Sequence, residues 1–128
     1  TERAQENLAM PTKDDVLVAL RAMKALGLGA YETEDPRAKH AQGLLDAWRA
    51  RLDQEAGTDP VARIRASVEK SIVLIEAGYD DDEMLSSAIG WLDNDLADAE
   101  IIKNPELTAE IEAKIERLDE ALKSKSKS

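Results

Sequence analysis

Carboxylates are the side chains whose spacing in this sequence comes nearest to that of a chemical site. Acidic residues three positions apart share one face of a helix, and two such pairs on facing helices can hold a divalent cation. The candidate pairs with this spacing are Asp80 with Glu83, Asp95 with Asp98, and Glu116 with Asp119. The chemistry that they could support is magnesium- or manganese-assisted hydrolysis.

The first and last of these pairs resemble the paired acids of helical nucleotide pyrophosphohydrolases of the MazG type. The resemblance implies a helical fold and a carboxylate-based hydrolase that depends on Mg or Mn. Asp80 and Glu83 depart from the family pattern, since they stand at a helix end and are not two glutamates. A metal-dependent hydrolase is therefore the alternative hypothesis and not the leading one.

Other catalytic groups are scarce. The only histidine, His40, lies in Lys39-His40-Ala41-Gln42-Gly43, which lacks the Lys and Gly three and four residues after the His of phosphotransfer domains. The absence of cysteine excludes disulfides, thiolate zinc sites and Cys nucleophiles. No glycine-rich phosphate loop or calcium loop is complete. We therefore assign no catalytic residue, no metal ligand and no cofactor, and the chain is more consistent with a binding protein than with an enzyme.

Five helices are expected to position the acidic residues. Asp-Pro or Asn-Pro pairs at 35–36, 59–60 and 104–105 place a capping residue before a proline, which is typical of helix starts. Apolar residues follow each start at helical spacing. The expected helices cover residues 13–26, 36–56, 60–77, 81–101 and 105–123. Short connections favour antiparallel neighbours, so we predict an all-α, up-and-down bundle of four main helices plus a fifth.

The breadth of each apolar face predicts where a helix lies in the bundle. Residues 72–75 are four consecutive apolar residues, which indicates a central helix with neighbours on several sides. The stripe between Leu107 and Leu122 is narrow and suits an outer helix or a coiled-coil partner. Residues 1–11 are expected to form an N-terminal arm, residues 12–123 one helical domain, and residues 124–128 a disordered basic tail.

The overall charge restricts the classes of partner. The chain carries a formal net charge of −10, which opposes direct binding to nucleic acid or to an anionic membrane. No apolar run approaches the length of a membrane span. A cytoplasmic protein is the expectation from these features together with the lack of cysteine.

The negative charge is concentrated in one segment. Residues 80–100 contain eight acids and no base, whereas the segments 35–58, 59–79 and 101–128 each have equal numbers of acids and bases. Acids at the start of the helix are stabilised by its dipole, but those in its second half are not. The segment therefore predicts a partner-binding surface formed by acidic residues together with a Met and a Trp that point away from the apolar stripe of the helix. Its residues are Met84, Trp91, Asp93, Asp95, Asp98 and Glu100.

The leading hypothesis is a non-enzymatic interaction or regulatory module that presents this acidic face to a basic protein. A sharper version is an inhibitor that mimics the phosphate spacing of nucleic acid. In the alternative without a binding role, the acidic face is only solvated and maintains solubility. A third hypothesis is a self-associating structural subunit, because Trp91 and the helix at 105–123 both offer apolar surface for a homodimer.

Overall fold

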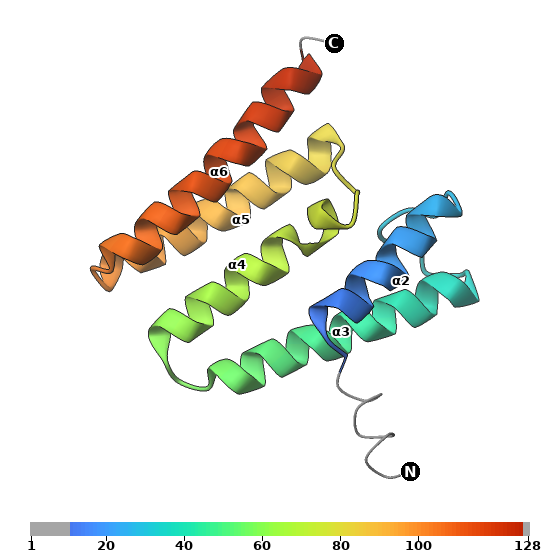
Figure 1. Cartoon of the computed structure of the whole chain (residues 1–128), viewed down its shortest axis with the longest axis horizontal. Coiled ribbons are helices and arrows are strands. Elements are labelled where there is room, and N and C mark those ends of the chain that lie inside the picture. Colours follow the sequence, from blue (N-terminus) through green and yellow to red (C-terminus); the bar gives the residue numbers. More distant parts are fainter. Residues whose placement is uncertain (1–10, 127–128) are drawn as a thin grey trace.

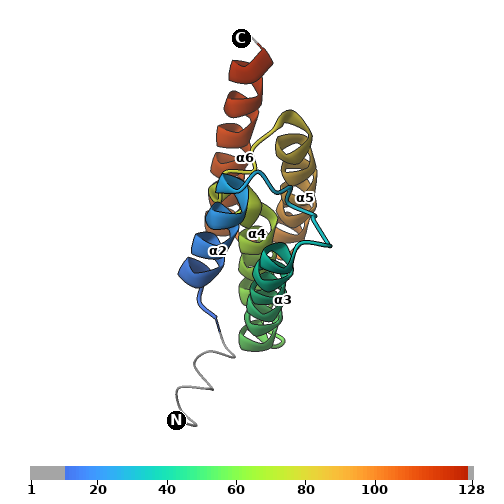
Figure 2. The same ribbon diagram turned by 90° about the vertical axis from the view of Figure 1, so that its right-hand side faces the viewer.

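Five α-helices dominate residues 11–126, the part of the chain that the computed structural model describes. They are α2 (Lys13–Ala25), α3 (Pro36–Ala56), α4 (Pro60–Glu76), α5 (Asp82–Ile101) and α6 (Pro105–Ser126). Helices that follow one another in the chain run antiparallel, and they succeed one another across the molecule from α2 and α3 to α6 (Figures 1 and 2). The prediction of an all-α protein whose helices pack as a bundle is confirmed.

The helix starts follow from local capping chemistry. The side chain of Thr12 accepts a hydrogen bond from the Asp15 amide at 3.2 Å. The Asp15 carboxylate in turn accepts one from the Thr12 amide at 3.0 Å. Asp81 accepts from the Met84 amide at 2.8 Å at the start of α5. These bonds satisfy amides that the first helical turn leaves free, and every predicted start lies within one residue of the observed one.

The C-terminal end of the chain differs from the prediction. The last helix was expected to end at residue 123, but α6 continues to Ser126, so the predicted disordered tail is wrong for residues 124–126. Lys123 and Lys125 lie in the last turn, where positive charge is favoured by the helix dipole. Residues 1–10 of the predicted arm and residues 127–128 of the tail lie outside the described residues. None of the described helices combines the length and the apolar composition that crossing a membrane requires.

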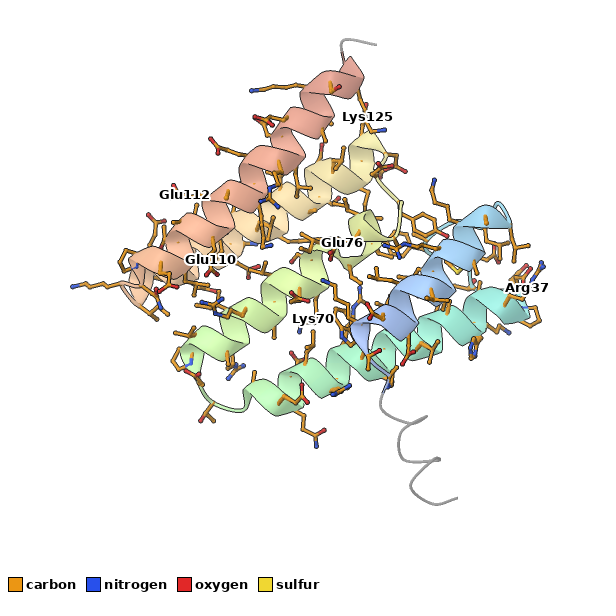
Figure 3. The ribbon with its side chains drawn as sticks, in the orientation of Figure 1. Arg37, Lys70, Glu76, Glu110, Glu112 and Lys125 are labelled. Atoms are coloured by element: carbon orange, nitrogen blue, oxygen red, sulfur yellow. The ribbon has the colours of Figure 1, made fainter. Side chains whose placement is uncertain are left out.

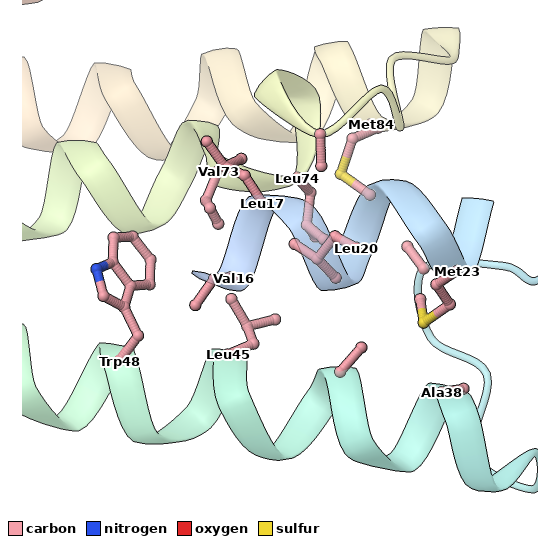
Figure 4. Packing of buried hydrophobic residues seen from close by; sticks show 13 residues of the cluster. Val16, Leu17, Leu20, Met23, Ala38, Leu45, Trp48, Val73, Leu74 and Met84 are labelled. Carbon is pink, nitrogen blue, oxygen red and sulfur yellow. The ribbon is translucent and has the colours of Figure 1, made fainter. Parts of the chain in front are cut away.

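Helix α4 is central, as its broad apolar face predicts, because it contributes to two hydrophobic clusters. The first, called the α2–α3–α4 cluster, includes Leu20, Leu45, Trp48 and Val73 (Figure 4). The second, called the α4–α5–α6 cluster, includes Ile64, Val68, Leu85, Leu92, Leu107 and Ile111. Ile75 on α4 packs against both clusters. Consequently α5 has α4 on one flank and α6 on the other, which determines where its acidic side chains point.

Candidate functional site

The predicted acidic surface of α5 divides between two flanks of the helix. Asp93 lines a groove between α5 and α6. Asp95 and Asp98 line a pocket between α4 and α5 that also reaches the end of α3. The two positions are separated because Asp93 and Asp95 are two residues apart, which is about 200° around a helix. The structure therefore does not bring the six predicted residues together on one surface.

Met84 is buried, so the expectation that it forms part of an exposed surface was wrong. The side chain is only 8% exposed and belongs to the α2–α3–α4 cluster. Its sulfur lies 3.9 Å from the hydroxyl of Tyr31, which donates to it. The first turn of α5 therefore packs against the α2–α3–α4 cluster, whereas the rest of the helix packs in the α4–α5–α6 cluster. The apolar stripe of α5 alone does not reveal this contact.

Asp95 is also buried, and the prediction of an exposed carboxylate there was wrong. The residue is 5% exposed, and its Oδ1 accepts a hydrogen bond of 2.7 Å from the Ser67 hydroxyl on α4. Oδ2 has no hydrogen-bond partner among the described residues. A buried polar atom without a partner is costly, and more so when it is charged. Asp95 is therefore a buried carboxylate of which only one oxygen is satisfied within the described part of the chain.

The remaining predicted residues are exposed. Trp91 is 41% exposed, which is large for an aromatic side chain, and Asp93, Asp98 and Glu100 all lie at the surface. Glu100 follows Asp93 by two helical turns and shares its side of α5. The exposure that the sequence predicted for these four residues is thus confirmed, whereas their binding to a partner stays a prediction.

The groove between α5 and α6 is acidic and has an apolar floor. Its volume is about 480 Å³. The acidic residues are Asp93 on α5 and Glu112 and Glu116 on α6, and no basic side chain of residues 11–126 lines the groove. The apolar lining is formed by Leu96, Ala109, Ala113 and Ile115.

The acids of this groove are unpaired. None of the ion pairs among residues 11–126 involves Asp93, Glu112 or Glu116. By contrast, Glu110 on α6 pairs with Arg65 on α4 at 2.8 Å. Figure 3 shows Glu110 on the side of α6 towards α4 and Glu112 on the opposite side. On α6, the ion-paired Glu110 and the unpaired Glu112 therefore lie on different sides of the helix.

The pocket between α3, α4 and α5 has a mixed, polar lining and a volume of about 480 Å³. Lys70 on α4 reaches across to Asp53 on α3 and forms an ion pair of 2.6 Å (Figure 3). Burial raises the pKa of Asp95 above its ordinary value of 3.8. The Ser67 hydrogen bond and the charge of Lys70 lower this pKa, and the negative charge of Asp98 raises it. The net direction is upward, since burial penalises the charged carboxylate.

The acidic pairs of the hydrolase alternative do not converge. Within residues 11–126, no three His, Cys, Asp or Glu side chains come together in a way that could hold a metal ion. Glu116 contributes to the α5–α6 groove and Asp95 to the pocket on the other flank of α5. His40 lines a third hollow, between α2 and α3, together with Val18 and Leu44.

Glu112, Ser67 and Lys70 are site residues that sequence reasoning missed, and Glu116 was considered only as a metal ligand paired with Asp119. The charge count hid the two glutamates, because residues 101–128 contain six acids and six bases and appear neutral. A helical projection of residues 109–116 would have shown Glu112 and Glu116 on one side and Lys114 on the other. Ser67 and Lys70 carry no local signal, since their roles depend on which helices lie beside α4.

The raised pKa of Asp95 predicts a stability that grows on acidification relative to an uncharged variant. A carboxyl whose pKa is higher in the folded state holds its proton more tightly there, so it destabilises the fold as pH rises above 3.8. We expect the free energy of unfolding of the wild type, minus that of Asp95→Asn, to increase as pH falls from about 7 towards 3.8. Urea denaturation of both proteins at a series of pH values measures this difference.

Asp93→Asn serves as the exposed control for that series, because Asp93 lies on the other flank of α5, and its difference from the wild type should change less with pH. If the wild type and Asp95→Asn instead have parallel stability profiles, Asp95 titrates like an ordinary surface carboxyl. That result would contradict the burial of its carboxylate.

Two surfaces on opposite flanks of α5 are therefore the candidate sites. The α5–α6 groove combines unpaired acids with an apolar floor, and the α3–α4–α5 pocket combines a buried carboxylate with charged groups of both signs. Comparisons of the chain with protein families, curated proteins and solved structures find no significant match.

Proposed function

We propose that the protein is a non-enzymatic interaction module that binds a basic segment of another protein in the α5–α6 groove. The observation that carries this proposal is the lining of the groove: Asp93, Glu112 and Glu116 line it, and none of the other described residues that line it is basic. Complementary charge on a partner would steer its approach and make the binding depend on salt.

The apolar floor supports a protein partner over a simple counterion. Ala109 and Ala113 are exposed on α6, and Leu96 and Ile115 are partly buried between the helices. Small side chains on a helix surface allow another backbone to approach closely. A partner segment with Lys or Arg beside apolar residues would therefore gain from both burial and charge.

The acidic residues of α5 beyond the groove reinforce the field around it. Glu100 lies on the same side of α5 as Asp93, and Asp98 remains exposed near the end of the helix. Residues 80–100 contain no base, so α5 itself contributes only negative charge to this part of the surface. The proposed groove differs from the surface expected from sequence, because it includes Glu112 and Glu116. Met84 is buried, and Asp95 and Asp98 line the pocket on the other flank of α5.

Neutralising the groove tests the proposal. The probe is an amphipathic Lys- and Leu-containing peptide with a fluorescent label, and its anisotropy reports binding. We expect the variant Asp93→Asn/Glu112→Gln/Glu116→Gln to bind about tenfold more weakly at low salt, since each exposed charge contributes about 0.2–1 kcal/mol. Raising the ionic strength from about 0.01 M to about 1 M shortens the Debye length from about 30 Å to about 3 Å and should abolish the difference.

A second triple variant separates the groove from the net charge. Glu34→Gln/Asp46→Asn/Asp59→Asn removes three exposed acids elsewhere, so both variants change the net charge from −10 to −7. This control should bind the peptide nearly as well as the wild type. Equal weakening of the two variants would show that only total charge matters, and the proposed groove would then have no specific role.

A further inference from the structure

The α3–α4–α5 pocket, on the other flank of α5, has more acidic than basic residues in its lining. Its lining includes three acids and two bases, together with Gly57, Ile64 and Ser67. The charged residues are Asp53, Arg63, Lys70, Asp95 and Asp98. The volume of about 480 Å³ falls within the range of small-molecule sites, and a polar lining suits a hydrophilic ligand.

The deepest group in this pocket is an acceptor without a donor. Asp95 is 5% exposed, Ser67 occupies its Oδ1 at 2.7 Å, and its Oδ2 has no partner within the described part of the chain. Asp98 lies one turn further along the same side of α5, where it remains exposed. Two carboxylates in this arrangement can both accept hydrogen bonds from one group that carries several N–H donors.

The bases in the pocket leave this acceptor unfilled. Lys70 forms its ion pair with Asp53, at 2.6 Å, and does not donate to Oδ2 of Asp95. Arg63 is exposed and takes part in none of the ion pairs found among residues 11–126. What remains is two acids on α5 facing one base on α4, which is a pattern of two negative charges and one positive.

We propose that this pocket binds a small molecule that carries a guanidinium group and a carboxylate. The guanidinium group donates to Asp95 and Asp98, and the carboxylate of the ligand pairs with Arg63. A planar guanidinium has five N–H donors in a fixed fork, which suits two neighbouring carboxylates better than a single ammonium does. A basic amino acid also has the complementary charge pattern of two positive groups and one negative. This site is independent of the α5–α6 groove.

Calorimetric titration of the full chain with L-arginine tests the proposal. We expect saturable binding, and we expect Asp95→Asn to weaken it by about tenfold to a hundredfold, because a hydrogen bond to a charged group is lost in a buried place. Asp98→Asn changes only an exposed residue and should also weaken binding, by less. Agmatine has the guanidinium group but no carboxylate, so it should bind the wild type more weakly than L-arginine does. The Arg63→Gln variant should bind agmatine and L-arginine with equal affinity.

The control is Asp46→Asn, which removes an exposed acid of α3 that does not line the pocket and should bind L-arginine like the wild type. Circular dichroism of each variant confirms that it is folded. The proposal is overturned if the wild type shows no saturable binding, or if Asp95→Asn and Asp98→Asn both bind L-arginine as the wild type does. Equal affinity of the wild type for agmatine and L-arginine would remove Arg63 from the site.

Discussion

Truncating Leu92 to alanine should lower the free energy of unfolding by about 2–5 kcal/mol. Leu92 lies on α5, is 0% exposed and belongs to the α4–α5–α6 cluster. Its removal would leave a cavity between three helices whose backbones cannot all close in on it, so both the transfer free energy and the packing contacts of the side chain are lost. Urea denaturation followed by far-ultraviolet circular dichroism measures the loss.

The matched control for this change is Leu26→Ala. Leu26 follows the last turn of α2 and is 51% exposed, so the same chemical truncation should cost no more than about 0.5 kcal/mol. A similar loss in both variants would mean that Leu92 does not occupy a packed interior, which would contradict the placement of α5 between α4 and α6.

Truncating Trp48 to alanine should have an effect of similar or greater size on the other cluster. Trp48 lies on α3, is 3% exposed and packs within the α2–α3–α4 cluster (Figure 4). Removal of a buried tryptophan costs about 3–5 kcal/mol. For a chain of this length, such a loss lowers Tm by roughly 10–25 °C, which differential scanning calorimetry would record.

Trp91→Ala is the corresponding control, because it makes the same change at a side chain that is 41% exposed. Its effect on Tm should be much smaller than that of Trp48→Ala. Should the two variants unfold at the same temperature, Trp91 would have to be covered in solution. That outcome would favour a second copy of the chain or another segment on this face of α5.

The helices were predictable because their ends are determined locally. Asp35, Asp59 and Asn104 each precede a proline, and the amides of a first helical turn can be satisfied by side chains only a few residues away. The broad apolar face at residues 72–75 likewise predicted the central place of α4, since such a face must be covered on several sides. The C-terminal limit of α6 was less predictable, because lysines suit both a solvated tail and a final helical turn.

The candidate sites were less predictable, because they depend on which helices lie side by side. A helical projection of α5 correctly predicts that Trp91 is exposed. It wrongly places Asp95 at the surface, because the sequence does not show that Ser67 of α4 faces it. The α5–α6 groove combines Asp93 with acids of a second helix whose total charge appears neutral in the sequence. Side-chain direction within one helix is a local property, whereas burial and pairing belong to the assembled fold.

The order of the helices has a consequence for how the chain reaches its folded state during synthesis. The extensive contacts join helices that are consecutive in the chain, together with α2 and α4. Such local contacts close small loops and allow folding within about a microsecond to a millisecond. A ribosome needs on the order of seconds to add the residues after α4. The α2–α3–α4 cluster can therefore assemble before α5 and α6 emerge. Met84 and Asp95 of α5 then join a scaffold that already exists, where Asp95 meets the Ser67 hydroxyl of α4.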